Sequence, residues 1–258
     1  MKWIGLIATI VTGALLLIAM GDFADFGDPQ SPANAGVEGH DSVSQYFVTD
    51  TYKDTKVPNL VTAVLADYRG YDTMFETVVI FAAGIAIFSI LRVFSCQFPQ
   101  PPAVDTSVDG DHKRIIIGTT CKLIIPIIQL FALYVVAHGH YSPGGGFQGG
   151  VILGASFILL ALARDLGSAL DRFPERRYFA IGCIGIIIYA GFGLVSQALE
   201  RNFLDYGILS RIMPATGEEI ARSHSMLGVE VGVAFTVTAI MFAIYSTLSS
   251  NGRLDNGL

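Results

Sequence analysis

Long apolar runs with few charges alternate with shorter polar segments along this chain. Six of the runs are long enough to cross a membrane, and they cover residues 3–20, 74–91, 115–137, 147–163, 178–199 and 223–249. A hydrocarbon core of about 30 Å is crossed by a helix of about 20 apolar residues. Only structures that satisfy their own backbone hydrogen bonds can span it. The pattern therefore predicts an all-α integral membrane protein with about six transmembrane helices.

The first run and one short stretch need separate interpretation. Residues 3–20 share features with a signal peptide, because Lys2 precedes the run and Ala19 lies near its end. We expect an uncleaved membrane helix instead. The stretch from Val57 to Tyr68 is apolar but has only 12 residues, so it predicts one short interfacial or re-entrant helix.

Two polar segments divide the chain. Residues 21–56 are acidic and rich in Gly and Pro, which suits a solvent-exposed excursion. Residues 98–111 (FPQPPAVDTSVDGD) hold three prolines and are typical of an extended linker. We therefore predict a two-span module over residues 1–97 and a four-span module over residues 112–258.

The distribution of Lys and Arg predicts the orientation. Segments on the side of the N-terminus hold nine of these residues, and the opposite segments hold six over longer loops. Cytoplasmic loops of membrane proteins carry the excess of positive charge. Both termini are therefore predicted to be cytoplasmic.

Composition narrows the function. Hydrophobic residues make up 52% and charged residues 15%, against about 25% charged residues in soluble domains. The net charge of −6 argues against a nucleic-acid partner. Cys96, Cys121 and Cys183 lack the spacing of a disulfide framework or a metal site. Because no cofactor motif or nucleophile–base pattern is found either, we expect ion handling or scaffolding rather than catalysis by this chain.

A glycine-rich stretch, HGHYSPGGGFQGG at residues 138–150, joins the third and fourth predicted spans. Irregular backbone at membrane depth has to be buried in protein or line a watery cavity. His138 and His140 could relay protons there, because histidine exchanges protons near neutral pH. The alternative, which composition alone favours, is a tight hairpin whose histidines bind backbone groups. The structural loop residues are Pro143, Gly144, Gly145, Gly146, Phe147, Gly149 and Gly150.

A pair of carboxylates lies at the start of the second long run. Asp72 and Glu76 are four residues apart and so share a helix face near the membrane boundary, which suits a cation or proton entry site with Arg69 as counter-charge. Gly70 is expected to end the short helix, and Asp72 or Thr73 to cap the next. A cap with an interfacial salt bridge is the favoured alternative for Asp72, whereas both interpretations weigh equally for Glu76.

Two ionisable residues, Lys122 and Glu230, interrupt predicted spans. Such residues cost about 2.5–3.5 kcal/mol on insertion scales and indicate a functional site by default. Lys122 can instead extend its amine to the headgroups. Glu230 lies too deep for that and needs a partner, either Lys122 or a cation of another subunit. The spacings Gly150-x-x-x-Gly154 and Gly228-x-x-x-Gly232 indicate close helix packing.

Three stretches closely resemble known families. HGHYSPGGGFQGGVILGASFIL and SMLGVEVGVAFTV resemble the B subunit of Mrp/Mnh-type multisubunit cation/proton antiporters, over about residues 112–249. NLVTAVLADYRGYDTMFETVVIFAAGIAIFSILR resembles the tail of the large A subunit, which matches a separate small subunit of membrane-bound hydrogenases. That second resemblance covers roughly residues 57–92, and residues 3–20 fit the preceding span.

The resemblance implies a subunit of a Na+/H+ exchange assembly in a prokaryotic cytoplasmic membrane, without a cofactor or metal. Its partners would be antiporter-like and small membrane subunits, with Na+ and H+ as the ions. The positions implied to matter for transport are Asp72, Glu76, Pro143 and Phe147. Here the A-like tail is fused to the B-like module, and the lysine–glutamate antiporter core is missing from the sequence, so exchange would depend on partners. The alternatives are an ion-translocating subunit of a hydrogenase-like redox complex and a purely structural membrane subunit.

Overall fold

The computed structural model describes residues 2–31, 33–34, 42–95, 111–213, 217–250 and 252. The regular elements of these residues are helical: α1 Lys2–Met20, α2 Val43–Thr55, α3 Leu60–Ala63, the π-helix η1 Val64–Tyr68, α4 Gly70–Ser95, α5 Asp111–His138, α6 Gly146–Ala163, α7 Leu166–Arg172, α8 Glu175–Ala198, the 3-10 helix η2 Tyr206–Arg211 and α9 Glu218–Ser249. Six helices, namely α1, α4, α5, α6, α8 and α9, are long and apolar enough to cross a membrane. The predicted all-α membrane fold and its six spans are confirmed.

The chain forms two compact units, Met1–Asp50 and Thr51–Leu258. The first unit contains α1 and most of α2. The sequence pattern did not predict α2, because most of its thirteen residues are polar and the others form no continuous apolar stripe. Its start is stabilised by the Ser42 hydroxyl, which accepts a hydrogen bond from the Gln45 N–H at 3.2 Å.

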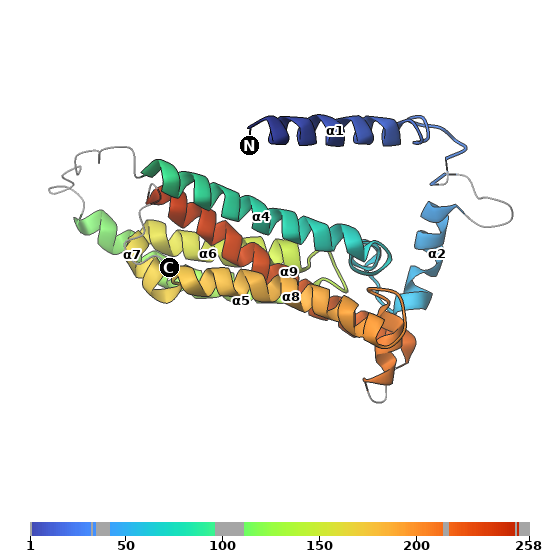
Figure 1. The fold of residues 1–258 in the computed structure, drawn as a ribbon. Coiled ribbons are helices and arrows are strands. Elements are labelled where there is room, and N and C mark those ends of the chain that lie inside the picture. The colour runs from blue at the N-terminus through green and yellow to red at the C-terminus, as the bar shows by residue number, and fades with distance from the viewer. Residues whose placement is uncertain are drawn as a thin grey trace. The chain divides into compact units, whose positions relative to one another are not determined.

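The second unit is a helical bundle in which α9 packs against α4, α6 and α8 (Figure 1). Glycines bring the helices close, as the predicted small-residue spacings require. A Cβ placed on Gly185 of α8 would lie 2.3 Å from the Gly232 carbonyl oxygen of α9. A Cβ on Gly150 of α6 would lie 2.9 Å from the Ala234 carbonyl oxygen. The backbones of α6 and α8 therefore lie directly against the backbone of α9.

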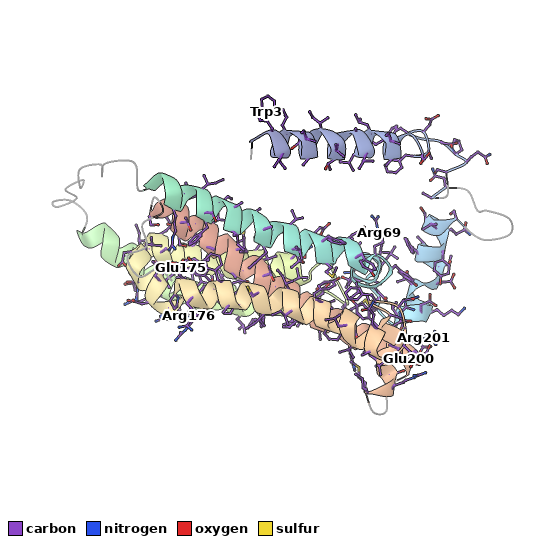
Figure 2. The ribbon with its side chains drawn as sticks, in the orientation of Figure 1. Trp3, Arg69, Glu175, Arg176, Glu200 and Arg201 are labelled. Atoms are coloured by element: carbon purple, nitrogen blue, oxygen red, sulfur yellow. The ribbon has the colours of Figure 1, made fainter. Side chains whose placement is uncertain are left out.

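Charged side chains mark the two ends of this bundle. Figure 2 shows Arg69, Glu200 and Arg201 at one end and Glu175 with Arg176 at the other. At the second end, Arg92 of α4 donates to both carboxylate oxygens of Glu175, at 2.9 and 2.8 Å. Fixed charges at both ends with apolar helices between them are the arrangement that a bilayer favours.

The predicted modules and the compact units divide the chain differently. Most of the predicted linker, residues 98–110, lies outside the described residues. Within the second unit, α4 of the first predicted module packs against α9 of the second. The two modules stay a prediction about the sequence, and the structure shows that parts of both build one bundle.

The crossing of α8 and α9 can be tested with an alanine at Gly185. Its Cβ would meet the Gly232 carbonyl and the Thr236 hydroxyl, each at 2.3 Å, so we expect a loss of about 1–3 kcal/mol. Gly191→Ala on the same helix is the matched control, because no atom lies within 4 Å of its Cβ position. Thermal unfolding in detergent should show a lower Tm for Gly185→Ala alone. Equal Tm values for the two variants would contradict this packing.

Candidate functional site

The short apolar stretch becomes α3 followed by the π-helix η1, and a single residue, Arg69, separates η1 from α4. The Arg69 N–H donates to the Val64 carbonyl at 2.7 Å, and the Asp72 N–H donates to the Arg69 carbonyl at 2.9 Å. The expected arrangement of caps is therefore wrong: Gly70 begins α4 instead of ending the short helix. Neither Asp72 nor Thr73 precedes α4, and the Thr73 hydroxyl donates back to the Leu65 carbonyl at 2.9 Å. The π turn closes through backbone bonds, so a glycine stop is not needed.

Asp72 lies in the first turn of α4 and forms an ion pair with Arg69. Both side chains are exposed, at 44% and 61%, and exposed pairs contribute little to stability. This is the geometry of the interfacial salt bridge considered for Asp72. Glu76 lies one turn further along α4, where it lines a cavity.

The glycine-rich loop brings the start of α6 to the carboxylate of Glu230. The Gly146 N–H donates to Glu230 Oε2 at 2.7 Å. Gly145 has φ +127°, and a Cβ there would lie 2.6 Å from the same oxygen. The N-terminal end of a helix attracts negative charge, so α6 holds and orients the Glu230 carboxylate.

This contact lies well inside the bundle. Glu230 follows the first residue of α9, Glu218, by 12 residues, which corresponds to roughly 18 Å along the helix axis at 1.5 Å per residue. The loop between α5 and α6 therefore reaches inward from the end of the bundle. Its backbone lines a cavity at that depth, as irregular backbone in a membrane requires.

The cavity has a volume of about 280 Å³ and is built by residues from α3, η1, α4, α6, α8 and α9. Its polar lining includes Thr62, Glu76, Gln148, Tyr189 and Glu230. A water molecule occupies about 30 Å³ in the liquid, so a hydrated monovalent cation fits. The two predicted carboxylates, Glu76 of α4 and Glu230 of α9, thus share one cavity although they belong to different predicted modules.

The other loop residues separate into two groups. Gly144, Gly146 and Phe147 line the cavity. Gly149 and Gly150 instead allow close packing, since a Cβ on Gly149 would lie 2.3 Å from Val136 Cγ2 of α5. Pro143 is exposed in the loop just before these positions.

Three further predicted residues lie outside the cavity lining. Lys122 is exposed on α5, and the Gly146 amide, rather than Lys122, contacts Glu230. The ring of His138 stacks between Tyr134 and Tyr141, with centroid distances of 4.8 and 5.7 Å. His140 is buried, and its Nε2–H donates to the Ser223 carbonyl at 2.9 Å. His140 thus has the backbone contact of the hairpin alternative, whereas His138 has aromatic contacts instead.

The environment of His140 favours the neutral ring. Burial lowers the pKa of His140, the neighbouring His224 lowers it further, and the contact with the Ser223 carbonyl opposes both. A group whose pKa is lowered on folding contributes stability above its unfolded value of about 6.5. That contribution is lost as the pH falls through the folded value.

We therefore expect the Tm of the protein to fall when the pH is lowered from about 7.5 to about 5.5, across the ordinary pKa of histidine. In His140→Gln the fall should be smaller, because glutamine can donate to the Ser223 carbonyl without titrating. His138→Gln, which removes a stacked ring instead, is the control. Thermal unfolding at both pH values measures the difference. An unchanged pH dependence in His140→Gln would show that His140 is not the titrating group.

Several contributors carried no local signal in the sequence. Asn59 and Thr62 bind the glycine-rich loop from α3, and the Tyr189 hydroxyl donates to the Gly70 carbonyl at 2.9 Å. Arg222 Nε lies 2.6 Å from Asp67 Oδ2, which connects η1 to α9. Burial raises the pKa of Asp67, and the Arg222 guanidinium opposes this rise. Among the described residues, no three His, Cys, Asp or Glu side chains gather into a metal site.

The comparison with known families agrees with both resemblances. Residues 116–243 match the domain related to the MnhB subunit of Na+/H+ antiporter. Residues 35–107 match the MbhE family, which is described as the E subunit of MBH. Together these regions contain Glu76 and Glu230, and therefore both carboxylates of the cavity.

Two relatives extend the match. A protein of Rhizobium meliloti (strain 1021), described as the probable A/B subunit of a K(+)/H(+) antiporter, is 27% identical over 197 residues. The match covers 69% of this chain and 19% of that protein, so this chain spans about a fifth of its length. A protein of Staphylococcus aureus (strain Newman), named as antiporter subunit mnhB2, is 29% identical over 139 residues, which cover 54% of this chain and 96% of that protein.

Two solved structures share the fold. A chain of the Mrp complex from Dietzia sp. DQ12-45-1b has a TM-score of 0.66 and 25% identity, covering 99% of this chain and 26% of that chain. A chain of the membrane-bound sulfane sulfur reductase, an archaeal respiratory membrane complex, has a TM-score of 0.56 and 24% identity, covering 93% and 97%. The second likeness shows the fold alone. The chain is therefore a multi-pass membrane protein whose residues 116–243 are similar to the domain related to the MnhB subunit of Na+/H+ antiporters.

Proposed function

We propose that this chain is an integral membrane subunit of a multisubunit Na+/H+ antiporter and that it contributes to the path of the cation and the proton. The observation that carries the proposal is the cavity lined by Glu76 and Glu230. The MnhB match and the likeness to the Mrp complex support the choice of assembly.

The chemistry follows from the two carboxylates. Each can hold a proton or balance the charge of a cation, and both lie where a hydrated monovalent cation has room. Glu76 is exposed and Glu230 is half-buried, so Glu76 lies at the accessible side of the site. Entry of a cation would favour release of a proton from the same pair, which is the coupling that exchange requires. The chain would act in transport and not as an enzyme.

The remaining predicted residues have less direct roles in this proposal. Asp72 with Arg69 would form the charged rim near the start of α4. His138, His140 and Lys122 stay predicted members of the ion path, although their contacts favour structural parts. The partners are other antiporter-like and small membrane subunits, in a prokaryotic cytoplasmic membrane with both chain termini on the cytoplasmic side.

A redox-coupled alternative has support of its own. The match to the MbhE family favours it. In that case the same cavity would move ions, but electron transfer elsewhere in the complex would drive them.

The assembly can be identified by purifying it through a tag on this chain. We expect antiporter-like membrane subunits to co-purify, and the complex in liposomes should move protons when a Na+ gradient is imposed. Partners with iron–sulfur or nickel–iron centres would support the redox alternative instead. Full Na+/H+ exchange in membranes from cells that lack this chain would contradict the proposal.

A further inference from the structure

The side chain of Asn59, just before α3, contacts the glycine-rich loop. Its Nδ2 lies 2.7 Å from the Gly139 carbonyl oxygen and 2.8 Å from the Ser142 carbonyl oxygen. The backbone N–H of Asn59 donates to the His140 carbonyl at 2.9 Å. Three carbonyls of the loop are thus bound by one residue that lies some eighty positions earlier in the chain.

Thr62 completes this contact from the first turn of α3. Its hydroxyl donates to the Gly139 carbonyl at 2.8 Å and lies 2.9 Å from Asn59 Nδ2, whose two hydrogens point to the Gly139 and Ser142 oxygens. The Gly139 oxygen therefore uses both of its lone pairs. Loop carbonyls at this depth have little access to water, and unpaired ones would be costly.

Gly139 connects this contact to the ion site. A Cβ on Gly139 would lie 2.9 Å from Gly145 Cα and 3.2 Å from Glu230 Oε2. Its carbonyl side therefore faces Asn59 and Thr62, while its Cα side packs on the residues that hold the Glu230 carboxylate. A movement of Gly139 away from α3 would shift Gly145 and the Gly146 amide relative to Glu230.

We propose that Asn59 is a positioning residue for the cation site: it fixes the glycine-rich loop so that the Gly146 amide meets Glu230. The proposal rests on the proposed function, because it assumes that Glu230 takes part in binding the cation. Asn59 need not touch the ion. Its effect passes through Gly139 and Gly145 to the orientation of one carboxylate.

A role of Asn59 that is limited to capping α3 can be distinguished by the choice of substitution. Asn59 is also the N-cap of α3, and its Oδ1 accepts from the Val61 N–H at 3.1 Å. Asp and Ser serve as N-caps about as well as Asn. Asn59→Asp and Asn59→Ser therefore keep the cap while removing the Nδ2 donor. An effect shared by these two variants reports on the loop and not on α3.

The test uses the assembled complex in liposomes with Asn59→Asp, Asn59→Ser and Asn202→Ser. Asn202 is exposed in the loop after α8 and serves as the matched control. We expect the apparent KM for the cation to rise about tenfold in both Asn59 variants, as for a loss of about 1.4 kcal/mol. The maximal rate per assembled complex should stay within about twofold, because both carboxylates remain in place and only binding is weakened. Amide hydrogen exchange over residues 139–146 should be faster in both variants.

The variants are repeated with Glu230→Gln to separate the two proposals. If Asn59 acts through Glu230, the added Asn59 substitution should cause no further rise in KM. Unchanged KM and unchanged hydrogen exchange in Asn59→Asp and Asn59→Ser would overturn the positioning role, even if Glu230→Gln abolishes exchange. A fall in the maximal rate that is explained entirely by a lower amount of assembled complex would also overturn the positioning role. Full Na+/H+ exchange by the Glu230→Gln complex would instead contradict the proposed function itself.

Discussion

Glu230→Gln is expected to lower Na+/H+ exchange by the assembled complex about a hundredfold, the lower limit of what a proton-transferring side chain contributes. Glutamine has nearly the same shape, and its carbonyl oxygen can still accept from the Gly146 N–H. It can neither take up a proton nor neutralise a cation. The fold should therefore persist while the charge chemistry of the cavity is lost.

Glu219→Gln provides the matched control, since Glu219 lies exposed in the first turn of the same helix. Both variants should be present in membranes at wild-type amounts and should co-purify the same subunits. Exchange is measured in vesicles over a range of Na+ concentrations and pH values. Activity of Glu230→Gln equal to that of Glu219→Gln would mean that the cavity carboxylate is not on the path.

Gly146→Ala should have the second large effect, in this case on assembly and stability. A Cβ on Gly146 would lie 2.0 Å from the backbone oxygen of Glu230, and neither backbone can move without separating α6 from α9. Alanine is the better helix former by about 1 kcal/mol, so a stabilisation would result if this contact were absent. We expect instead a loss of about 3 kcal/mol, the upper range for an overpacked site.

Gly118→Ala on α5 is the control, because its Cβ position has no atom within 4 Å. The thermal stability of the purified complex and the amount of this chain within it are the measurements. Gly146→Ala should lower both, and Gly118→Ala should lower neither. A Gly146→Ala complex as stable as the wild type would place the start of α6 away from Glu230.

The spans were predictable because apolar length alone decides whether a helix can cross a bilayer. Glu76 and Glu230 could also be singled out one by one, since a carboxylate next to or within an apolar run needs a reason. Their common cavity was not predictable, because it depends on the packing of α4 and α9, which are far apart in the sequence. The short polar helix α2 was missed for a related reason, as it has no apolar stripe to reveal its period.

Asn59 illustrates a different reason why part of the site could not be predicted from the sequence. In the structure Asn59 is the N-cap of α3, a role that the apolar pattern of the sequence did not predict. The second use of the same side chain, on the Gly139 and Ser142 carbonyls, depends on a loop that has no sequence relation to it. The start of α4 was mispredicted because a π turn, which has no simple residue signature, replaced the expected glycine stop.

The most direct test of a shared cation site is a double-mutant cycle with Glu76→Gln, Glu230→Gln and the combination, measured as Na+/H+ exchange in liposomes at equal amounts of complex. Residues that act in one site are strongly non-additive. We predict that the double variant is no less active than the weaker of the two single variants. Losses that multiply, or exchange that survives in all three variants, would contradict a cation site formed by Glu76 and Glu230 together.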